Sequence, residues 1–175
     1  MGMGTNRSES LNPANIHITQ QNITIGNLME RLEHQKFDLR ADFQDQRTTW
    51  TPEQQSRLIE SLMLKIPLPV FYFDVSEWEK WKVIDGLQRL RVIQDYLAGS
   101  NGKTSLKPFS GFQYFTDFNA YTFDQLPRQY IRHIRDSQII AYTIEKGTPE
   151  AVVRNIIQRI HTGNHKETTP PILSL

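Results

Sequence analysis

A short segment at residues 83–90 (VIDGLQRL) constrains the fold of this chain more than any other. Val83 and Ile84 end a β-rich run, Gly86 permits a tight turn, and Leu87 and Leu90 start an amphipathic helix. The first turn of such a helix directs backbone N–H groups and the positive end of its dipole at one spot. The segment therefore predicts a strand-to-helix turn that suits a phosphate group.

The remaining pattern predicts helices and strands that mix without a regular strand–helix–strand rhythm, which favours an α+β fold in one domain. Helices are predicted at residues 25–32, 52–66, 87–97, 126–135 and 149–162, and strands at residues 37–43, 70–75, 81–84 and 138–144. Residues 99–121 give no clear assignment. The polar residues 1–22 are expected to form a flexible arm, residues 23–164 the domain, and residues 165–175 a tail.

Charge and composition exclude several classes of protein. Twenty basic residues stand against nineteen acidic residues, so a nucleic-acid surface has to be a local patch. The chain has no cysteine, which excludes disulfides, thiolate catalysis and cysteine zinc sites and fits a reducing compartment. No apolar run reaches the ~20 residues of a membrane span. We therefore expect a cytoplasmic protein without a membrane partner.

Two side chains in the 83–90 segment suit a phosphate site. Arg89 supplies a fork of donors for phosphate oxygens, and Asp85 is placed to cap the helix or to position a metal-bound water. An ordinary turn with a surface arginine explains the same residues equally well. Leu87 and Leu90 lie on the apolar stripe of the helix, whereas Gln88 and Arg89 lie off it and are expected to face a cleft. The expectation is that Arg89→Ala leaves the fold intact and weakens nucleotide binding.

Residues 85–89 (DGLQR) also resemble the D-G-Q-Q-R signature of the N-terminal domain of GmrSD-type restriction systems, a ParB-like family. Residues 43–50 (FQDQRTTW) resemble its Q-R-x-x-W element, and residues 58–69 (LIESLMLKIPLP) its helix and proline turn. Residues 159–163 (RIHTG) resemble its R-I-N-T-G element. The resemblance covers roughly residues 24–164.

This resemblance implies a ParB/sulfiredoxin-like fold, in which a small mixed sheet is flanked by helices and the signature loop faces a nucleotide. It also implies that a nucleoside triphosphate is bound, with or without Mg²⁺, and is hydrolysed in some members, coupled to recognition or cutting of modified foreign DNA. For this chain alone we expect weak or no NTPase activity. The residues that the resemblance assigns to the nucleotide are Gln46, Arg47, Asp85, Gly86, Gln88, Arg89 and Arg159, with Asp85 as the candidate catalytic group.

The sequence departs from the family pattern at Leu87, where Gln is common, and at His161, where Asn is usual. The chain carries no His-Asn-His nuclease motif, so we expect no nuclease activity of its own and a separate nuclease or effector domain as a partner. The alternatives are a DNA-binding or protein-interaction module that has lost nucleotide use, and a fragment of a larger restriction protein.

Other candidate groups are weaker. Arg128, Arg132 and Arg135 fall on one helical face and can follow a DNA backbone, although a solvated basic face explains them as well. The aromatic residues at 109–123 either stack bases or form a small core under a loop. No metal site is expected.

Overall fold

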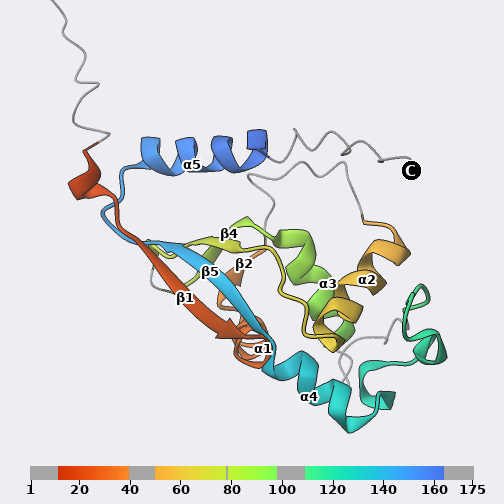
Figure 1. The fold of residues 1–175 in the computed structure, drawn as a ribbon. Coiled ribbons are helices and arrows are strands. Elements are labelled where there is room, and N and C mark those ends of the chain that lie inside the picture. Colours follow the sequence, from red (N-terminus) through yellow and green to blue (C-terminus); the bar gives the residue numbers. More distant parts are fainter. Residues whose placement is uncertain (1–11, 40–49, 78, 98–108, 164–175) are drawn as a thin grey trace, which may run out of the picture.

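The computed structural model describes residues 12–39, 50–77, 79–97 and 109–163 (Figure 1). The strands in these residues are β1 (Ile18–Thr24), β2 (Phe37–Asp38), β3 (Phe71–Asp74), β4 (Trp81–Asp85) and β5 (Gln138–Ile144). The helices are α1 (Ile25–Glu33), α2 (Pro52–Met63), α3 (Leu87–Leu97), α4 (Arg128–Asp136) and α5 (Glu150–Gly163). Short 3₁₀ turns form at Pro13–Asn15, Thr116–Phe118 and Phe123–Gln125. The expected α+β class is confirmed.

The five strands form one mixed sheet in the order β1-β5-β3-β4-β2. β5 is antiparallel to β1 and parallel to β3, while β4 is antiparallel to β3 and parallel to β2. Figure 1 shows α5 on one side of the sheet and α1 to α4 on the other. The expected hairpin of residues 70–75 and 81–84 is therefore present as β3 and β4.

Two apolar clusters hold these layers together. The larger lies between the sheet and helices α1 to α4 and contains Phe71 and Phe73 of β3, both fully buried. The smaller lies beneath α5 and joins Ile84, Ile144 and Ile157. Strand side chains alternate between the two faces, so the residues of β3 and β4 divide between the clusters. The helix α5 rests on a much smaller apolar contact than the other helices do.

The helix starts follow the sequence signals. The Thr24 side chain accepts a hydrogen bond from the Asn27 N–H and caps α1. At the start of α2 the Thr51 side chain and Gln54 form a reciprocal capping box, and Pro52 occupies the first helical turn. Among the described residues, no helix has the length and apolar character needed to cross a bilayer.

Two polar side chains, the buried Glu60 and the half-buried Asn119, hold the described part of the loop before α4. Glu60, which is 3% exposed, accepts hydrogen bonds from the N–H groups of Tyr114 and Phe115. Asn119 accepts from the N–H groups of Gly111 and Phe112. These side chains replace the regular backbone pairing that this segment lacks, which explains why its sequence carries no periodic signal.

Two predicted boundaries were wrong. Residues 18–22, expected within a flexible arm, belong to β1, which pairs with β5 along its whole length. Only one side chain of β1, Ile23, is buried, so the strand has no apolar alternation to reveal it. The expected strand at residues 37–43 is limited in the described residues to Phe37 and Asp38, and residues 40–49 lie outside the description.

Candidate functional site

The turn between β4 and α3 has the geometry expected of a strand-to-helix turn. Gly86 has a positive φ of 97°, which L side chains rarely adopt. A Cβ atom at this position would lie 2.4 Å from Cδ1 of Phe71. The Gly86 carbonyl then accepts a hydrogen bond from the Leu90 N–H, at 2.9 Å, as α3 begins. Glycine is therefore required here both by the backbone angle and by the close approach of the core.

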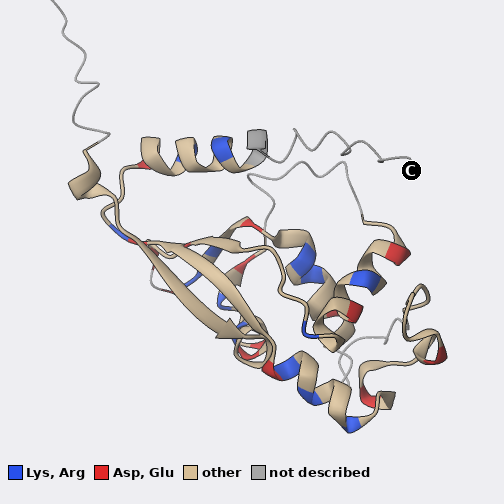
Figure 2. Cartoon of the chain, viewed as in Figure 1, with Lys and Arg blue, Asp and Glu red and all other residues tan. Residues whose placement is uncertain are grey.

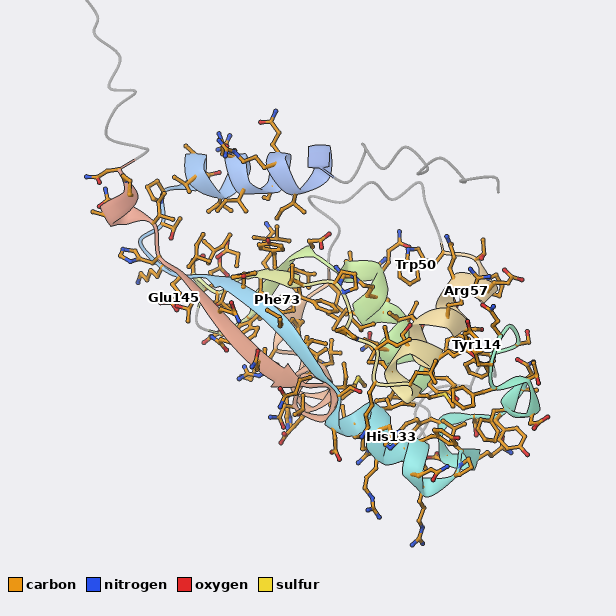
Figure 3. The ribbon with its side chains drawn as sticks, viewed as in Figure 1. Trp50, Arg57, Phe73, Tyr114, His133 and Glu145 are labelled. Carbon is orange, nitrogen blue, oxygen red and sulfur yellow. The ribbon has the colours of Figure 1, made fainter. Side chains whose placement is uncertain are left out.

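An open cavity of about 980 Å³ lies beside this turn and is lined from α5 as well as from α2 and α3. Its wall also includes the segment 67–70 and residues of β3 and β4. The residues that line it are Trp50, Arg57, Leu58, Ser61, Pro67, Leu68, Pro69, Val70, Tyr72, Asp85, Arg89, Arg159 and Ile160. Figure 3 labels Trp50 and Arg57, which lie close together near the start of α2.

Arg89 is the most constrained of these residues. Its Nη2 donates to Asp85 Oδ2 at 2.8 Å and to the Val70 carbonyl at 3.1 Å, and its Nη1 donates to the Pro69 carbonyl. Its guanidinium carbon lies 4.3 Å from the centre of the Phe71 ring. Arg89 thus joins the segment 67–70, the end of β4 and the start of α3.

Arg89 lies off the apolar stripe and lines the cavity, but it is not the exposed side chain that the expected mild effect of Arg89→Ala assumed. The residue is 8% exposed, because segment 67–70 and the Phe71 ring cover the guanidinium. Burial lowers the pKa of Arg89 from its ordinary value, and the Asp85 carboxylate offsets part of that effect. Three of the five N–H donors are occupied by the protein itself. Arg89 is therefore first of all a structural partner of Asp85 and of the segment 67–70.

Two more exposed arginines line the cavity from other helices. Arg57 projects from α2, and Arg159 from α5, where its Nε donates to Asn155 Oδ1 at 2.8 Å. Together with Arg89 they place three guanidinium groups around the cavity. Among the described residues that line it, the carboxylate is that of Asp85. Because Asp85 is already bonded to Arg89, the remaining charge among the described lining residues is positive and suits an anion.

Aromatic side chains form the apolar part of the same wall. Trp50 is half-buried before α2, and Tyr72 stacks on Tyr142 with ring centroids 5.3 Å apart. The pKa of Tyr72 is raised by burial first, and then by Tyr142 and Asp85. A cavity with guanidinium groups and aromatic rings can bind a ligand that carries both phosphates and a planar group.

The predicted site residues divide into three groups. The structure places Asp85, Arg89 and Arg159 on the cavity wall, with Gly86 buried in the turn behind them. Gln88 is half-buried in the first turn of α3 and is not among the lining residues described above. The predicted residues Gln46 and Arg47 lie outside the described residues.

The sequence did not single out Arg57 and Tyr72, and Trp50 entered only as the last residue of the Q-R-x-x-W element. Arg57 lies next to the apolar stripe of its helix, as Arg89 does, so helical periodicity could have indicated it. Tyr72 stands between Phe71 and Phe73 and points to the opposite face, which strand alternation predicts.

The predicted DNA-contacting arginines lie elsewhere, on α4. Arg128, Arg132 and Arg135 are all exposed, and we call them the basic face of α4. Figure 2 shows Lys and Arg positions along this helix. α4 packs against α1 and α2, on the side of the sheet opposite α5. The basic face of α4 and the cavity are therefore two separate surfaces.

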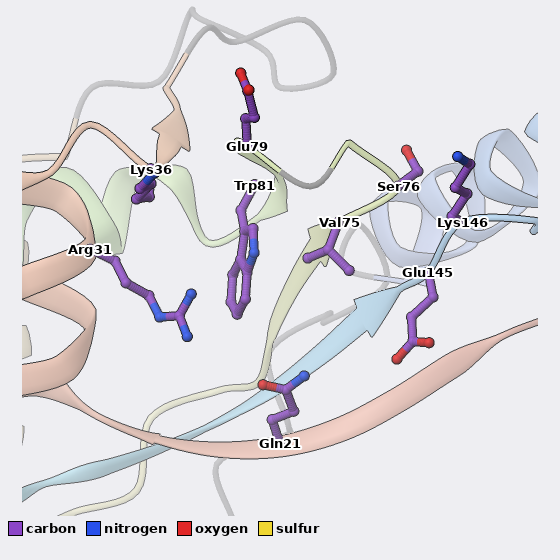
Figure 4. Close-up of a pocket in the computed structure, with 9 residues that line it drawn as sticks. All are labelled: Gln21, Arg31, Lys36, Val75, Ser76, Glu79, Trp81, Glu145 and Lys146. Carbon is purple, nitrogen blue, oxygen red and sulfur yellow. The ribbon is translucent and has the colours of Figure 1, made fainter.

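A second cavity, of about 790 Å³, lies on the other side of the sheet (Figure 4). Trp81 stands at its centre, with the Arg31 guanidinium 4.3 Å from the indole ring. Its wall carries three cationic and two anionic side chains, namely Arg31, Lys36, Lys146, Glu79 and Glu145. This near balance of charge gives the second cavity a weaker preference for an anion than the cavity beside Arg89.

Metal ligands do not gather in the described parts of the chain. Residues 12–39, 50–77, 79–97 and 109–163 contain no group of three His, Cys, Asp or Glu residues able to hold a metal ion. The described lining of the cavity beside the β4–α3 turn offers guanidinium groups, aromatic rings and the Asp85 carboxylate.

Comparison with known proteins identifies a family whose sequence profile includes the β4–α3 turn and the cavity beside it. The sequence profile of the GmrSD restriction endonuclease N-terminal domain matches residues 25–169, a range that includes every lining residue of the anion-suited cavity. No curated protein and no solved structure gives a match. The matched range covers most of the chain and all of the described sheet except β1, which ends one residue before the match begins. The chain therefore belongs to the family of GmrSD restriction endonuclease N-terminal domains, and its α+β fold is ParB-like.

Proposed function

We propose that this domain binds a nucleoside triphosphate in the cavity beside the β4–α3 turn. The observation that carries the proposal is that Arg57, Arg89 and Arg159 line one cavity. Asp85, the carboxylate among its described lining residues, already forms an ion pair with Arg89. A triphosphate carries several negative charges, and guanidinium groups bind phosphate oxygens through paired, charge-assisted hydrogen bonds. Family membership is a second, independent support for a role in restriction.

In this proposal the exposed cations contribute most of the binding. Arg57 and Arg159 lie at the surface of the cavity and contact the phosphates, whereas Arg89 chiefly keeps the segment 67–70 in place. Trp50 and Tyr72 supply aromatic surface for the base. The volume of about 980 Å³ is at the upper end of the usual range for small-ligand sites.

Hydrolysis by this domain alone is proposed to be weak or absent. The candidate catalytic group, Asp85, accepts a hydrogen bond from Arg89 at Oδ2, at 2.8 Å. A carboxylate that is held by a guanidinium group is a poor general base, because the ion pair favours its charged form. Mg²⁺ is proposed to arrive with the nucleotide, bound by phosphate oxygens. We further propose that the nucleotide couples this module to a separate nuclease or effector domain that cuts foreign DNA.

A thermal-shift screen with ATP, GTP, CTP and UTP, each with and without Mg²⁺, tests this proposal. A nucleotide present at about 100 times its dissociation constant should stabilise the protein by about 2.7 kcal/mol. Arg159→Ala should weaken binding by roughly 10-fold or more, as expected when a hydrogen bond to a charged group is lost. Arg154→Ala is the matched control, because Arg154 is exposed on the same helix and forms an ion pair with Glu150. A shift by no nucleotide, or equal loss in both variants, would contradict the proposal.

The second candidate function is DNA binding through the basic face of α4. The observation that favours it is that all three arginines of this face are exposed on a helix whose opposite side packs on the core. Their charges suit phosphate contacts, which set affinity without reading the sequence. Because this face and the cavity are separate surfaces, both functions can belong to one domain.

A further inference from the structure

β1 is an edge strand with one side unused among the described residues. It pairs with β5 on one side, and no described strand pairs with its other side. The pairing with β5 runs through all seven residues without a bulge, so β1 is continuous over its whole length. An edge of this kind is a ready template for another strand.

The alternation of hydrogen bonds between β1 and β5 identifies which backbone groups of β1 point away from the sheet. The Glu145 N–H donates to the His17 carbonyl and the Ile25 N–H donates to the Ser137 carbonyl, both at 2.9 Å. In an antiparallel pair such bonds alternate, so the odd-numbered residues of β1 direct their backbone groups at β5. The N–H and C=O groups of Ile18, Gln20 and Asn22 therefore point away from the sheet.

The composition of β1 does not protect this edge. Its sequence, ITQQNIT, contains no charged residue and no proline, which are the usual guards of an exposed edge. The opposite edge of the sheet differs, because β2 has only two residues. The outer side of β1 is thus the long, neutral edge of this domain.

We propose that two copies of this chain associate through β1, antiparallel and related by a two-fold axis, to join two five-stranded sheets. With the axis at Gln20, the outward groups of Gln20 face Gln20 of the second copy, and those of Ile18 face Asn22 of the second copy. Each of these pairs has the spacing of a hydrogen-bonded antiparallel pair. A second copy fits this edge because the outward residues 18, 20 and 22 are symmetric about Gln20, and because the uncharged strand meets itself without like-charge repulsion.

The full chain, measured by sedimentation velocity across a concentration series, tests this proposal. Wild type should form a dimer, and Gln20→Lys should weaken dimerisation at least ten-fold by placing two positive charges together at the axis. Gln20→Pro should act similarly, since it removes an outward N–H and no bond to β5. Gln113→Lys is the matched control, because Gln113 is an exposed glutamine in the loop before α4.

A cross-linking experiment supplies a direct readout of the register. The chain contains no cysteine, so Gln20→Cys introduces a single thiol. Facing strand residues lie about 5.5 Å apart, within disulfide range, and oxidation should give a covalent dimer. Gln113→Cys should remain monomeric under the same conditions.

Three outcomes would overturn the proposal. The first is a wild type that stays monomeric at every concentration. If a variant lacking residues 1–11 then dimerises, the edge of β1 belongs to the chain's own N-terminal segment in the wild type. The second is a dimer that Gln20→Lys leaves unchanged. The third is a dimer in which Gln20→Cys forms no cross-link.

Discussion

Removing the Arg89 side chain should destabilise the fold strongly. Arg89→Ala deletes the hydrogen bonds to the Pro69 and Val70 carbonyls, the ion pair with Asp85 and the contact with the Phe71 ring. The two side chains of the ion pair are only 10% and 21% exposed, so solvent screening is limited. Breaking a buried pair by removing one partner typically costs about 3–5 kcal/mol, much of it from the charge left behind.

The assay is unfolding of wild type and variant by urea and by heat, both followed by circular dichroism. Urea unfolding gives the free energy of unfolding directly. In the thermal scan, a loss of about 3–5 kcal/mol lowers the melting temperature by roughly 6–20 °C in a domain of this size. Arg91→Ala is the control on the same helix, since Arg91 is exposed and donates a hydrogen bond to the Leu39 carbonyl. Its cost should stay within about 1 kcal/mol. An equally small cost for Arg89→Ala would refute the assignment of Arg89 as a structural partner.

Four further predictions follow from particular residues. Gly86→Ala should leave little folded protein by circular dichroism, because the positive φ and the 2.4 Å approach to Phe71 both oppose a Cβ atom; a normal spectrum would contradict this. Tyr96→Phe should stabilise the protein by up to about 1–3 kcal/mol, since the buried Tyr96 hydroxyl has no hydrogen-bond partner among the described residues. Burial raises the pKa of Tyr96, so stability should fall as pH rises above about 10, and less so in Tyr96→Phe. Duplex DNA binding, if carried by the basic face of α4, should show a log–log salt slope of about −2.7, and a slope unchanged by replacing all three arginines with Ala would contradict it. Purified protein should not nick plasmid DNA with Mg²⁺ or Mn²⁺, and nicking that follows the protein peak through purification would contradict that expectation.

Local signals in the sequence predicted most of the elements. Caps, proline positions and apolar periodicity located α1, α2 and α3, because these helices bury one face and their ends satisfy their own backbone groups. β1 was missed because its edge position exposes nearly every side chain. Pairing with β5, more than one hundred residues away, creates that strand, and no local pattern records such pairing.

The candidate site was predicted only where local sequence determines it, and not where it depends on segments that are distant in the chain. The Asp85–Gly86 turn is encoded locally, and its glycine is required by the geometry found. The burial of Arg89 depends on the segment 67–70, which reaches it from about twenty residues earlier in the chain. Helical periodicity placed Arg89 off the apolar stripe, yet a neighbouring segment covers that flank of α3. Sequence spacing describes one helix and does not describe what packs beside it.

The different exposures of the three cavity arginines allow stability and binding to be separated. Arg57 and Arg159 are exposed, so their loss removes positive charge from the cavity and little from the fold. Arg89 is buried in a network with Asp85 and two backbone carbonyls, so its loss removes support from the wall itself. If the cavity binds phosphates, variants of the exposed pair should lower affinity at constant melting temperature, whereas Arg89→Ala should lower both. A phosphate site held in this way has one arginine that shapes the wall and two that meet the ligand.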